Sequence, residues 1–377
     1  MEELEEKESK ETEEIKESND VKETKEANKQ EKKDPVDTKK IAKRKEKLKN
    51  FLNNPLNLTA VALLVIVIVT KLYYFSLTSN QPTWWDEGDY LAIAKELAIP
   101  SVESPEWWGH FTRMRPPIMP LVWSFFIKFG LSEAIMRFFT LLIPSILLIV
   151  LTYLLAESLF NKRVALISGF LIATYWVVEF YTHRLLTDIP ALFLVMLSAY
   201  LFWEYYEKRK KPYGLYLSIF FGVLAFLTRF PSALVTMSAL AYLIFIKKHK
   251  FFTDKHIWIA GFIGVATLIP YFLWNKISLG SFFPAAAFYG SENTSTYFNP
   301  AWNLFQFIPQ FIGWPITALF LLGLIYALFN VLIGFDVVFK QKSKKCNKHL
   351  FLVSWLILQV IYFVFVIKTG NDRWMLT

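Results

Sequence analysis

Several residue types on which enzymes often depend are scarce in this sequence. Of its 377 residues, one is cysteine (Cys346) and five are histidine. An internal disulfide is therefore excluded, and a cysteine-based metal site is disfavoured. The sequence also lacks a Gly-rich phosphate loop, a Ser/His/Asp arrangement and a His-rich ligand spacing. We expect no cofactor and no metal site, although nothing in the sequence excludes a divalent metal.

Apolar residues, by contrast, are abundant and occur in long runs. The chain is 54% hydrophobic and contains 36 Phe. Several runs extend for about 18 to 25 residues, enough to cross about 30 Å of hydrocarbon as a helix. The composition predicts an all-α polytopic membrane protein. The formal net charge of +9 does not indicate nucleic-acid binding, because the cations cluster in short loops, as in the cytoplasmic connections of membrane proteins.

The first fifty residues differ from the rest of the chain. Residues 1–38 are mostly Glu, Lys, Ser, Thr and Asn, a composition that predicts disorder, with a charged helix as the alternative. Residues 39–50 are basic and are expected to hold the N-terminus in the cytoplasm and to contact anionic headgroups. No cleavable signal peptide is visible at residue 1. We divide the chain into a charged tail (1–50) and a membrane domain (51–377).

Nine segments are predicted to span the membrane. They are Leu58–Phe75, Ala134–Leu159, Val164–Tyr181, Ile189–Tyr206, Tyr213–Leu227, Pro231–Ile246, Ile257–Trp274, Leu304–Phe335 and Leu350–Ile367. The eighth contains Pro309 and Pro315 and is expected to begin as an interfacial helix. Pro116–Gly130 is too short to cross and is predicted to lie in the interface.

The loop charges support this number of crossings. With nine spans every Lys-rich loop is cytoplasmic, whereas a crossing at Pro116–Gly130 would turn all of these loops outward. We therefore predict a multi-pass plasma-membrane protein with a cytoplasmic N-terminus and a large external loop from Ser76 to about Ser132.

Unusual polar residues gather at the predicted outer ends of the spans. Charges near hydrocarbon are costly unless they are paired or face a polar cavity, so these residues are functional candidates. They are Asp86, Glu87, Asp89, His110, Arg113, Arg115, His183, Arg184, Asp188, Arg229, Asp372 and Arg373.

The acidic group at 86, 87 and 89 has two interpretations. Carboxylates early in a helix can simply favour the positive end of its dipole. A carboxylate base beside a cationic pocket is also what glycosyl transfer from a phosphate leaving group requires, since the base takes the proton of the acceptor hydroxyl and the cations stabilise the departing phosphate.

The neighbouring residues also leave alternatives open. Arg113 and Arg115 precede the prolines that set the start of the interfacial helix. Arginine suits bidentate phosphate contact, but it can also snorkel to headgroups. Asp188 is expected to N-cap the fourth span or to pair with an outer-face arginine. Asn293-Thr294-Ser295 is a weak N-glycosylation pattern in an external loop.

Tryptophan is frequent in the predicted external segments. Two interpretations explain this equally well. The rings can form an interfacial aromatic belt, or they can line a surface that stacks on sugars or contacts lipids. The residues are Trp84, Trp85, Trp107, Trp108, Trp123 and Trp302.

The order of motifs resembles a known superfamily. The motifs are Trp85-Asp86-Glu87-Gly88-Asp89-Tyr90, Arg115-Pro116-Pro117-Ile118-Met119-Pro120-Leu121, Ser132-Glu133-Ala134 with Arg137-Phe138, Thr187-Asp188-Ile189-Pro190-Ala191, Leu227-Thr228-Arg229-Phe230 and Asp372-Arg373-Trp374-Met375-Leu376. Together they resemble the GT-C superfamily of integral-membrane glycosyltransferases. The branch is similar to the protein O-mannosyltransferase and lipid A aminoarabinose transferase group.

The resemblance implies a polyprenyl-phosphate-linked sugar donor and inverting transfer on the outer face. It implies Asp86 as the base, with Glu87 orienting the acceptor or the base. Arg113, Arg115, Arg229 and Arg373 correspond to cations that bind the donor phosphate. Asp188 matches an acidic residue at the next external turn, and Asp89, His183 and Arg184 are supporting candidates. The acceptor would be a protein, glycan or lipid hydroxyl, mannose is the commonest sugar of this branch, and no nucleic acid is involved.

Two departures from the family pattern leave other functions open. The tail at 1–50 lies outside it, and relatives continue beyond Thr377, so we expect a C-terminally truncated chain with an incomplete donor pocket. The alternatives are a transporter or lipid-binding membrane protein and an inactive remnant of the family. A transporter is disfavoured because few ionisable residues lie mid-span and no repeated half is visible.

Overall fold

The structure is a computed structural model, and it describes residues 42–43, 45–46, 49–100, 115–284, 302–339 and 344–367. The regular secondary structure in these ranges is entirely helical, which confirms the predicted all-α class. The chain divides within helix α3 into two compact units, residues 1–61 and 62–377. The second unit holds the candidate site and is described below.

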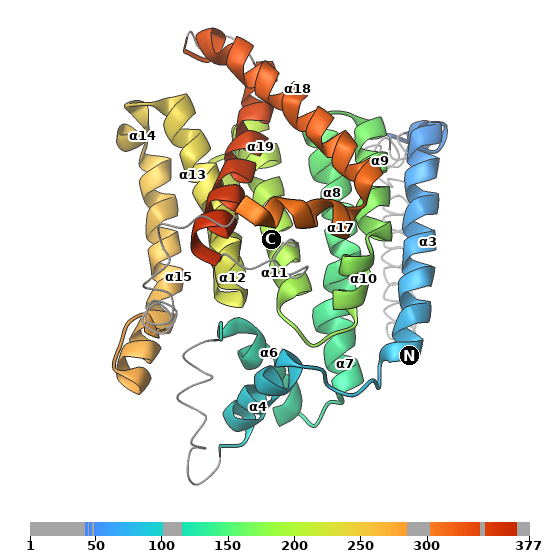
Figure 1. Ribbon diagram of the computed structural model, residues 1–377, viewed down its shortest axis with the longest axis vertical. Helices are drawn as coiled ribbons and strands as arrows, with labels where there is room; N and C mark the ends of the chain where they lie inside the picture. Colours follow the sequence, from blue (N-terminus) through green and yellow to red (C-terminus); the bar gives the residue numbers. More distant parts are fainter. Residues whose placement is uncertain are drawn as a thin grey trace, which may run out of the picture. The chain divides into compact units, whose positions relative to one another are not determined.

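The helices follow one another with short connections (Figure 1). In chain order they are α3 (Pro55–Thr78), α4 (Asp86–Ala98), α6 (Ile118–Lys128), α7 (Glu133–Arg137), η1 (Phe138–Leu142), α8 (Ile143–Leu159), α9 (Lys162–Thr174), α10 (Trp176–Thr182), α11 (Asp188–Tyr200), η2 (Leu201–Lys208), α12 (Pro212–Thr228), η3 (Phe230–Ser232), α13 (Ala233–Lys247), α14 (Lys250–Thr253), α15 (Lys255–Leu279), η4 (Trp302–Phe307), α17 (Ile308–Ile312), α18 (Trp314–Phe339), α19 (Lys344–Ile361) and η5 (Tyr362–Ile367).

Helices occupy all nine segments that were predicted to span the membrane. Within the described ranges, seven helices are long and apolar enough to cross a bilayer. The pair α9 and α10 makes an eighth crossing if its two parts are counted as one span. The helix α12 has 17 residues and packs between α11, α13 and α15. The protein is therefore a helical, multi-pass membrane protein.

Two of the predicted spans are interrupted. The third is bent by 56° between α9 and α10, at Tyr175, whose backbone is extended. No proline or glycine marks this break, and the bend turns Glu179 towards Lys71 of α3, with which it forms an ion pair. The eighth span begins, as expected, with a separate short helix, because Gly313 has a positive φ of 81° between α17 and α18.

The predicted interfacial helix is α6, and it forms a platform with α4. Trp123 of α6 is fully buried. Its indole nitrogen donates to the Thr140 hydroxyl at 3.0 Å, and its ring meets Tyr90 of α4 edge to face. The surrounding apolar cluster includes residues of the 183–187 loop. These contacts fix the first turn of α4, which carries Asp86.

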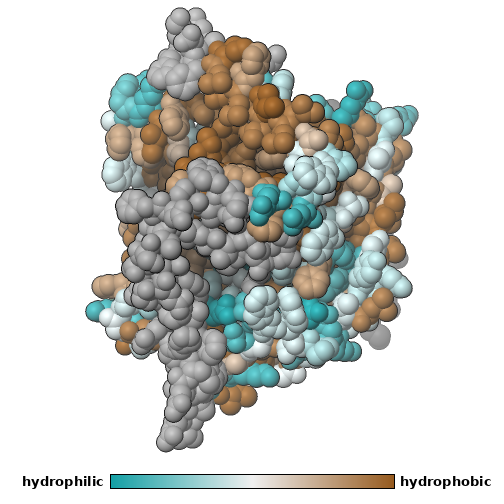
Figure 2. Space-filling view, viewed as in Figure 1, coloured by the Kyte–Doolittle hydropathy of each residue, from teal (hydrophilic) through white to brown (hydrophobic). Residues whose placement is uncertain are grey.

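The connections of the second unit alternate between two ends (Figure 1). The α10–α11 loop and the α12–η3 turn lie at the end of the α4–α6 platform. The α8–α9 turn and the α13–α14–α15 connection lie at the other end. On the face drawn in Figure 2, hydrophobic residues cover α18, and hydrophilic residues are more frequent towards the platform. We call the two ends the platform end and the basic end, since Lys208–Lys211 and Lys247–Lys250 lie at the latter.

Candidate functional site

The first turn of α4 begins with a strained residue. Trp85 has φ 48° and ψ −124°, a backbone conformation that costs a bulky side chain about 1–3 kcal/mol. Its ring is 68% exposed and lies edge to face on Trp84. Strain of this kind persists where the surrounding structure enforces it, and it is frequent at functional sites. Here it sets the direction in which Asp86 and Glu87 leave the chain.

Asp86 and Asp89 share one arginine at the surface of the platform. Arg115 donates to Asp86 Oδ1 and to Asp89 Oδ2, each at 2.8 Å. The side chain of Asp86 is 14% exposed, so solvent or a substrate can reach it. The Arg115 guanidinium also lies 5.1 Å from the centroid of the Tyr90 ring. The structure thus brings together two of the carboxylates and one of the arginines that the sequence predicted to act together.

Arg115 is held in its charged form, although it is largely buried. Burial opposes the charge, but the neighbouring Tyr90, Asp86 and Asp89 outweigh it and raise the pKa of the guanidinium above its ordinary value. Its Nε atom is buried and makes no hydrogen bond within the described ranges. A buried donor without a partner is costly, so this atom is available to an anionic ligand.

An apolar cavity adjoins this arginine. It has a volume of about 360 Å³, within the usual range of small-molecule sites. Among the residues that the structure describes, Arg115 is the one charged residue in its lining. Apolar residues of α4, α6, α12 and α15 make up most of the rest, together with Pro116 and Pro117. A ligand with an anionic group and a hydrocarbon chain matches such a site.

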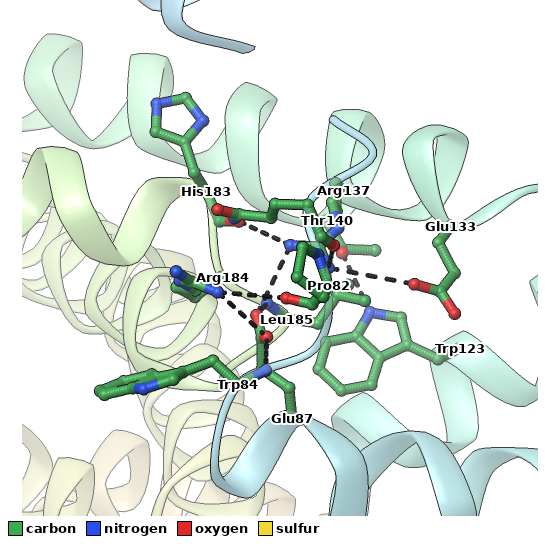
Figure 3. A network of polar contacts seen from close by, with 11 residues as sticks. Pro82, Trp84, Glu87, Trp123, Glu133, Arg137, Thr140, His183, Arg184 and Leu185 are labelled. Carbon is green, nitrogen blue, oxygen red and sulfur yellow. Dashed lines mark hydrogen bonds and ion pairs between the residues drawn. The ribbon is translucent and has the colours of Figure 1, made fainter. Parts of the chain in front are cut away.

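Glu87 is fully buried and lies in a separate polar network (Figure 3). Its carboxylate accepts from the backbone amides of Trp84 and Leu185, each at 2.5 Å. Two arginines approach it as well, Arg137 at 3.5 Å and Arg184 at 3.6 Å. Glu87 therefore ties the start of α4 to the 183–187 loop and does not open towards the apolar cavity.

Arg137 is the functional candidate that sequence analysis missed. It is 1% exposed, and besides Glu87 it donates to the backbone carbonyl of His183 at 2.6 Å. It is also 3.9 Å from Glu133. A lone cation at the start of an apolar span is unusual, and that signal could have identified it. Arg137 joins three segments that are distant in sequence.

His183 and Arg184, the predicted supporting residues, lie in the same network. The His183 backbone carbonyl also accepts from the Gln81 amide. Its ring is 3.1 Å from Glu179 of α10, which in turn forms a 2.7 Å ion pair with the buried Lys71 of α3. Arg184 lies over the ring of Trp84.

Asp188 and Arg229 form a buried ion pair with each other. The predicted N-cap role of Asp188 is wrong, because α11 starts at Asp188 itself and its cap residue, Thr187, makes no side-chain cap bond. The carboxylate turns instead to Arg229, just beyond the last turn of α12, and this was the other interpretation of the sequence. Arg229 follows Leu227, which lines the apolar cavity.

Other predicted residues lie outside the described ranges. They are His110, Arg113, Asp372, Arg373, Trp107, Trp108 and the Asn293-Thr294-Ser295 pattern. Of the tryptophans that the structure describes, Trp123 belongs to the core and Trp84 and Trp85 are exposed. Within the described ranges no three His, Cys, Asp or Glu side chains are grouped so that they could hold a metal ion.

Comparison with known proteins gave two similarities. Residues 114–274 match the model of the family described as dolichyl-phosphate-mannose-protein mannosyltransferase. This segment contains Arg115, Arg137, Asp188 and Arg229 and begins after Asp86 and Glu87. The chain is also 30% identical over 184 residues to an uncharacterized protein of Aquifex aeolicus (strain VF5), covering 48% of this chain and 36% of the relative. No solved structure matches.

Proposed function

We propose that this chain is a membrane glycosyltransferase of the GT-C kind, which moves a sugar from a polyprenyl-phosphate donor to a hydroxyl acceptor. The match of residues 114–274 to the dolichyl-phosphate-mannose-protein mannosyltransferase family supports this proposal. The observation that carries the proposal is the position of Asp86 and Arg115. A carboxylate and a guanidinium, both partly exposed, meet beside an apolar cavity. This is the arrangement that an amphiphilic phosphate donor and an acceptor hydroxyl need.

The cavity beside Arg115 takes the first isoprene units of the donor. Its apolar lining suits hydrocarbon, and the unpartnered Nε of Arg115 suits a phosphate oxygen. Arg229, near the same cavity, is the second phosphate candidate, and it must exchange part of its contact with Asp188 for the ligand. Arg113 and Arg373 keep their proposed phosphate-binding roles, outside the described ranges.

Asp86 acts as the general base. Donor binding draws Arg115 towards the phosphate and frees Asp86 Oδ1 from its ion pair. Asp86 then takes the proton of the acceptor hydroxyl, while the acceptor oxygen forms a bond to the anomeric carbon. The bond from that carbon to the phosphate oxygen breaks, and the electron pair leaves with the phosphate, whose charge Arg115 stabilises. Attack from the side opposite the leaving group inverts the anomeric configuration.

Glu87 and Arg137 position the base and do not touch the substrate. The burial of both side chains and the link from Glu87 to Leu185 hold the first turn of α4 against the 183–187 loop. Asp89 shares Arg115 with Asp86 and so keeps the guanidinium near the base. Glu87 therefore acts through the position of Asp86 and not on the reacting atoms themselves.

The reaction takes place on the outer membrane face, and the N-terminus is cytoplasmic. Lys-rich connections lie at the basic end and the Asp86 site lies at the platform end, as the positive-inside rule requires for an external site. A cysteine replacing Ser124, which is partly exposed in α6, is then labelled from outside, and Lys210→Cys is not. Labelling of Lys210→Cys from outside would overturn this orientation.

The proposed function is tested by a transfer assay. Membranes containing the full chain are given radiolabelled polyprenyl-phosphate sugars, mannose first, and the products are analysed for their linkage. We expect transfer from at least one donor, with inverted anomeric configuration. No transfer from any donor would favour the transporter or inactive-homologue alternatives. Retention of configuration would contradict direct attack by the acceptor.

A further inference from the structure

A second apolar cavity lies towards the basic end. It has a volume of about 360 Å³ and is formed by α12, α13, α14 and α15. Its lining includes Leu215 and Ile219 near the start of α12 and Phe251, Phe252 and Ile257 around the start of α15. The cavity beside Arg115 begins farther along the same helices, at Leu224 of α12 and Thr267 of α15. Among the residues that the structure describes, the two cavities share no lining residue.

Glycines on α15 create the space. Gly261 and Gly264 both line the cavity. A Cβ atom at Gly264 would lie 3.0 Å from Ile219 of α12, so this glycine lets the two helices approach closely. A Cβ atom at Gly261 would meet nothing within 4 Å. The helix surface at Gly261 is therefore open at the edge of the cavity, and a Cβ atom fits there without displacing a neighbour.

Three lysines adjoin the lining residues in sequence, and we call the part of the cavity next to them its mouth. Lys250 adjoins Phe251, Lys255 lies two residues before Ile257, and Lys211 lies one helical turn before Leu215. All three lysines are exposed, and no ion pair involves any of them within the described ranges. Hydrophilic residues are also seen in this corner, around α14, in Figure 2.

The acidic group at this mouth is already engaged. Asp254 forms an ion pair with Lys247 and accepts from the backbone amide of His256. Trp258, which lines the cavity, is 65% exposed, as is usual for tryptophan at headgroup level. The mouth therefore presents a net positive charge beside an amphipathic ring.

We propose that this cavity is a binding site for an anionic phospholipid of the membrane leaflet at the basic end. One acyl chain lies over α12, between α13 and α15 at Gly261, and the headgroup phosphate lies among Lys211, Lys250 and Lys255. Basic pockets between membrane helices bind such headgroups, and each lysine near the surface contributes to the affinity. The site is separate from the proposed sugar transfer and does not depend on it.

The polyprenyl donor does not match this site. Its sugar must reach Asp86 at the platform end, whereas the lysines that would hold its phosphate here lie at the basic end of the same helices. A neutral lipid would leave the three lysines without a counter-charge. An anionic diacyl lipid satisfies both the apolar walls and the basic mouth.

Native mass spectrometry of the purified full chain tests the site. The probes are phosphatidylglycerol and phosphatidylcholine with identical acyl chains. We expect one phosphatidylglycerol molecule to be retained at least fivefold better than phosphatidylcholine. Gly261→Leu should abolish this preference, because its side chain fills the cavity while raising helix propensity. The matched control is Gly323→Leu on α18, where a Cβ atom also meets nothing within 4 Å.

A second pair of variants tests the headgroup contact. Lys250→Gln and Lys255→Gln should each weaken phosphatidylglycerol retention about fivefold, which corresponds to about 1 kcal/mol per lysine. Lys276→Gln, at the other end of α15, should leave it unchanged. Retention by Gly261→Leu equal to that of wild type would overturn the proposal, as would equal retention of the two lipids. Displacement of phosphatidylglycerol by polyprenyl phosphate would overturn the assignment of the occupant.

Discussion

The pairing of Glu87 with Arg137 gives the sharpest stability prediction. Both side chains are at most 1% exposed and lie 3.5 Å apart. Removing one partner of a buried ion pair leaves the other charge uncompensated and costs about 3–5 kcal/mol. We expect Arg137→Met to lower the free energy of unfolding by about 3 kcal/mol, the lower end of this range. The loss is limited because the Glu87 carboxylate still accepts hydrogen bonds from the amides of Trp84 and Leu185.

A double-mutant cycle separates this ion pair from simple loss of packing. Glu87→Gln keeps an acceptor for the backbone amides but removes the charge. We expect the free energies of unfolding lost by Glu87→Gln and Arg137→Met to be non-additive, with a coupling energy of about 2–3 kcal/mol, because the double variant buries no charge at this point. Titration with a denaturing detergent in mixed micelles, followed by Trp fluorescence, measures the cycle.

The matched control is Glu133→Gln. Glu133 also faces Arg137, but at 3.9 Å and with a side chain that is 43% exposed. Solvent screens such a pair, so its loss should cost less than about 1 kcal/mol. If Arg137→Met were no more costly than this control, or if the two changes of the cycle were additive, Glu87 and Arg137 would not form the clamp inferred from the structure.

Three further predictions concern other parts of the molecule. Lys71→Met should cost about 2 kcal/mol of unfolding free energy and Lys71→Met/Glu179→Gln clearly less, since the single variant leaves a partly buried carboxylate without its ammonium partner. Equal costs would contradict this. Trp85→Gly should unfold at a higher detergent concentration than Trp85→Ala, because only glycine relieves the positive φ; the reverse order would mean that the strain is absent. Partial burial opposes the charge of Asp254, but contact with Lys247 lowers the pKa of its carboxyl below the ordinary value. Wild type should therefore be more stable than Asp254→Asn above about pH 4, the ordinary carboxyl range, and should lose this advantage as the pH falls below it. A pH-independent difference in unfolding midpoint would refute the contribution of the ion pair.

The helices could be predicted from the sequence because membrane spans are encoded locally. Long apolar runs have a length that the bilayer sets, and the short run at Pro116–Gly130 contains the short helix Ile118–Lys128. The bend at Tyr175 was not predicted, since neither proline nor glycine marks it. The bend brings Glu179 to Lys71, with which it forms an ion pair. These two residues are 108 positions apart in the sequence, so local patterns could not reveal their contact.

The candidate site could be predicted only in part. Adjacent carboxylates at Asp86 and Glu87 looked equivalent in sequence, but the fold separates them. One meets Arg115 beside a cavity, and the other is buried against the amide of Leu185, which is 98 residues away. Periodicity and spacing carry no information about such long-range partners. For the same reason Arg137 was noted in a motif without a role, and the sequence left open whether Asp188 caps a helix or pairs with an arginine.

The central claim is that Asp86 is the base of a sugar transfer, and the most direct measurement compares Asp86→Asn with Asp89→Asn. Both variants remove one carboxylate from Arg115, so they perturb the ion-pair network alike. Loss of a general base should lower the initial rate of transfer by about 10²–10⁴-fold in Asp86→Asn, and the rate of Asp89→Asn should stay within about tenfold of wild type. Equal rates in the two variants, or robust transfer by Asp86→Asn, would contradict the account.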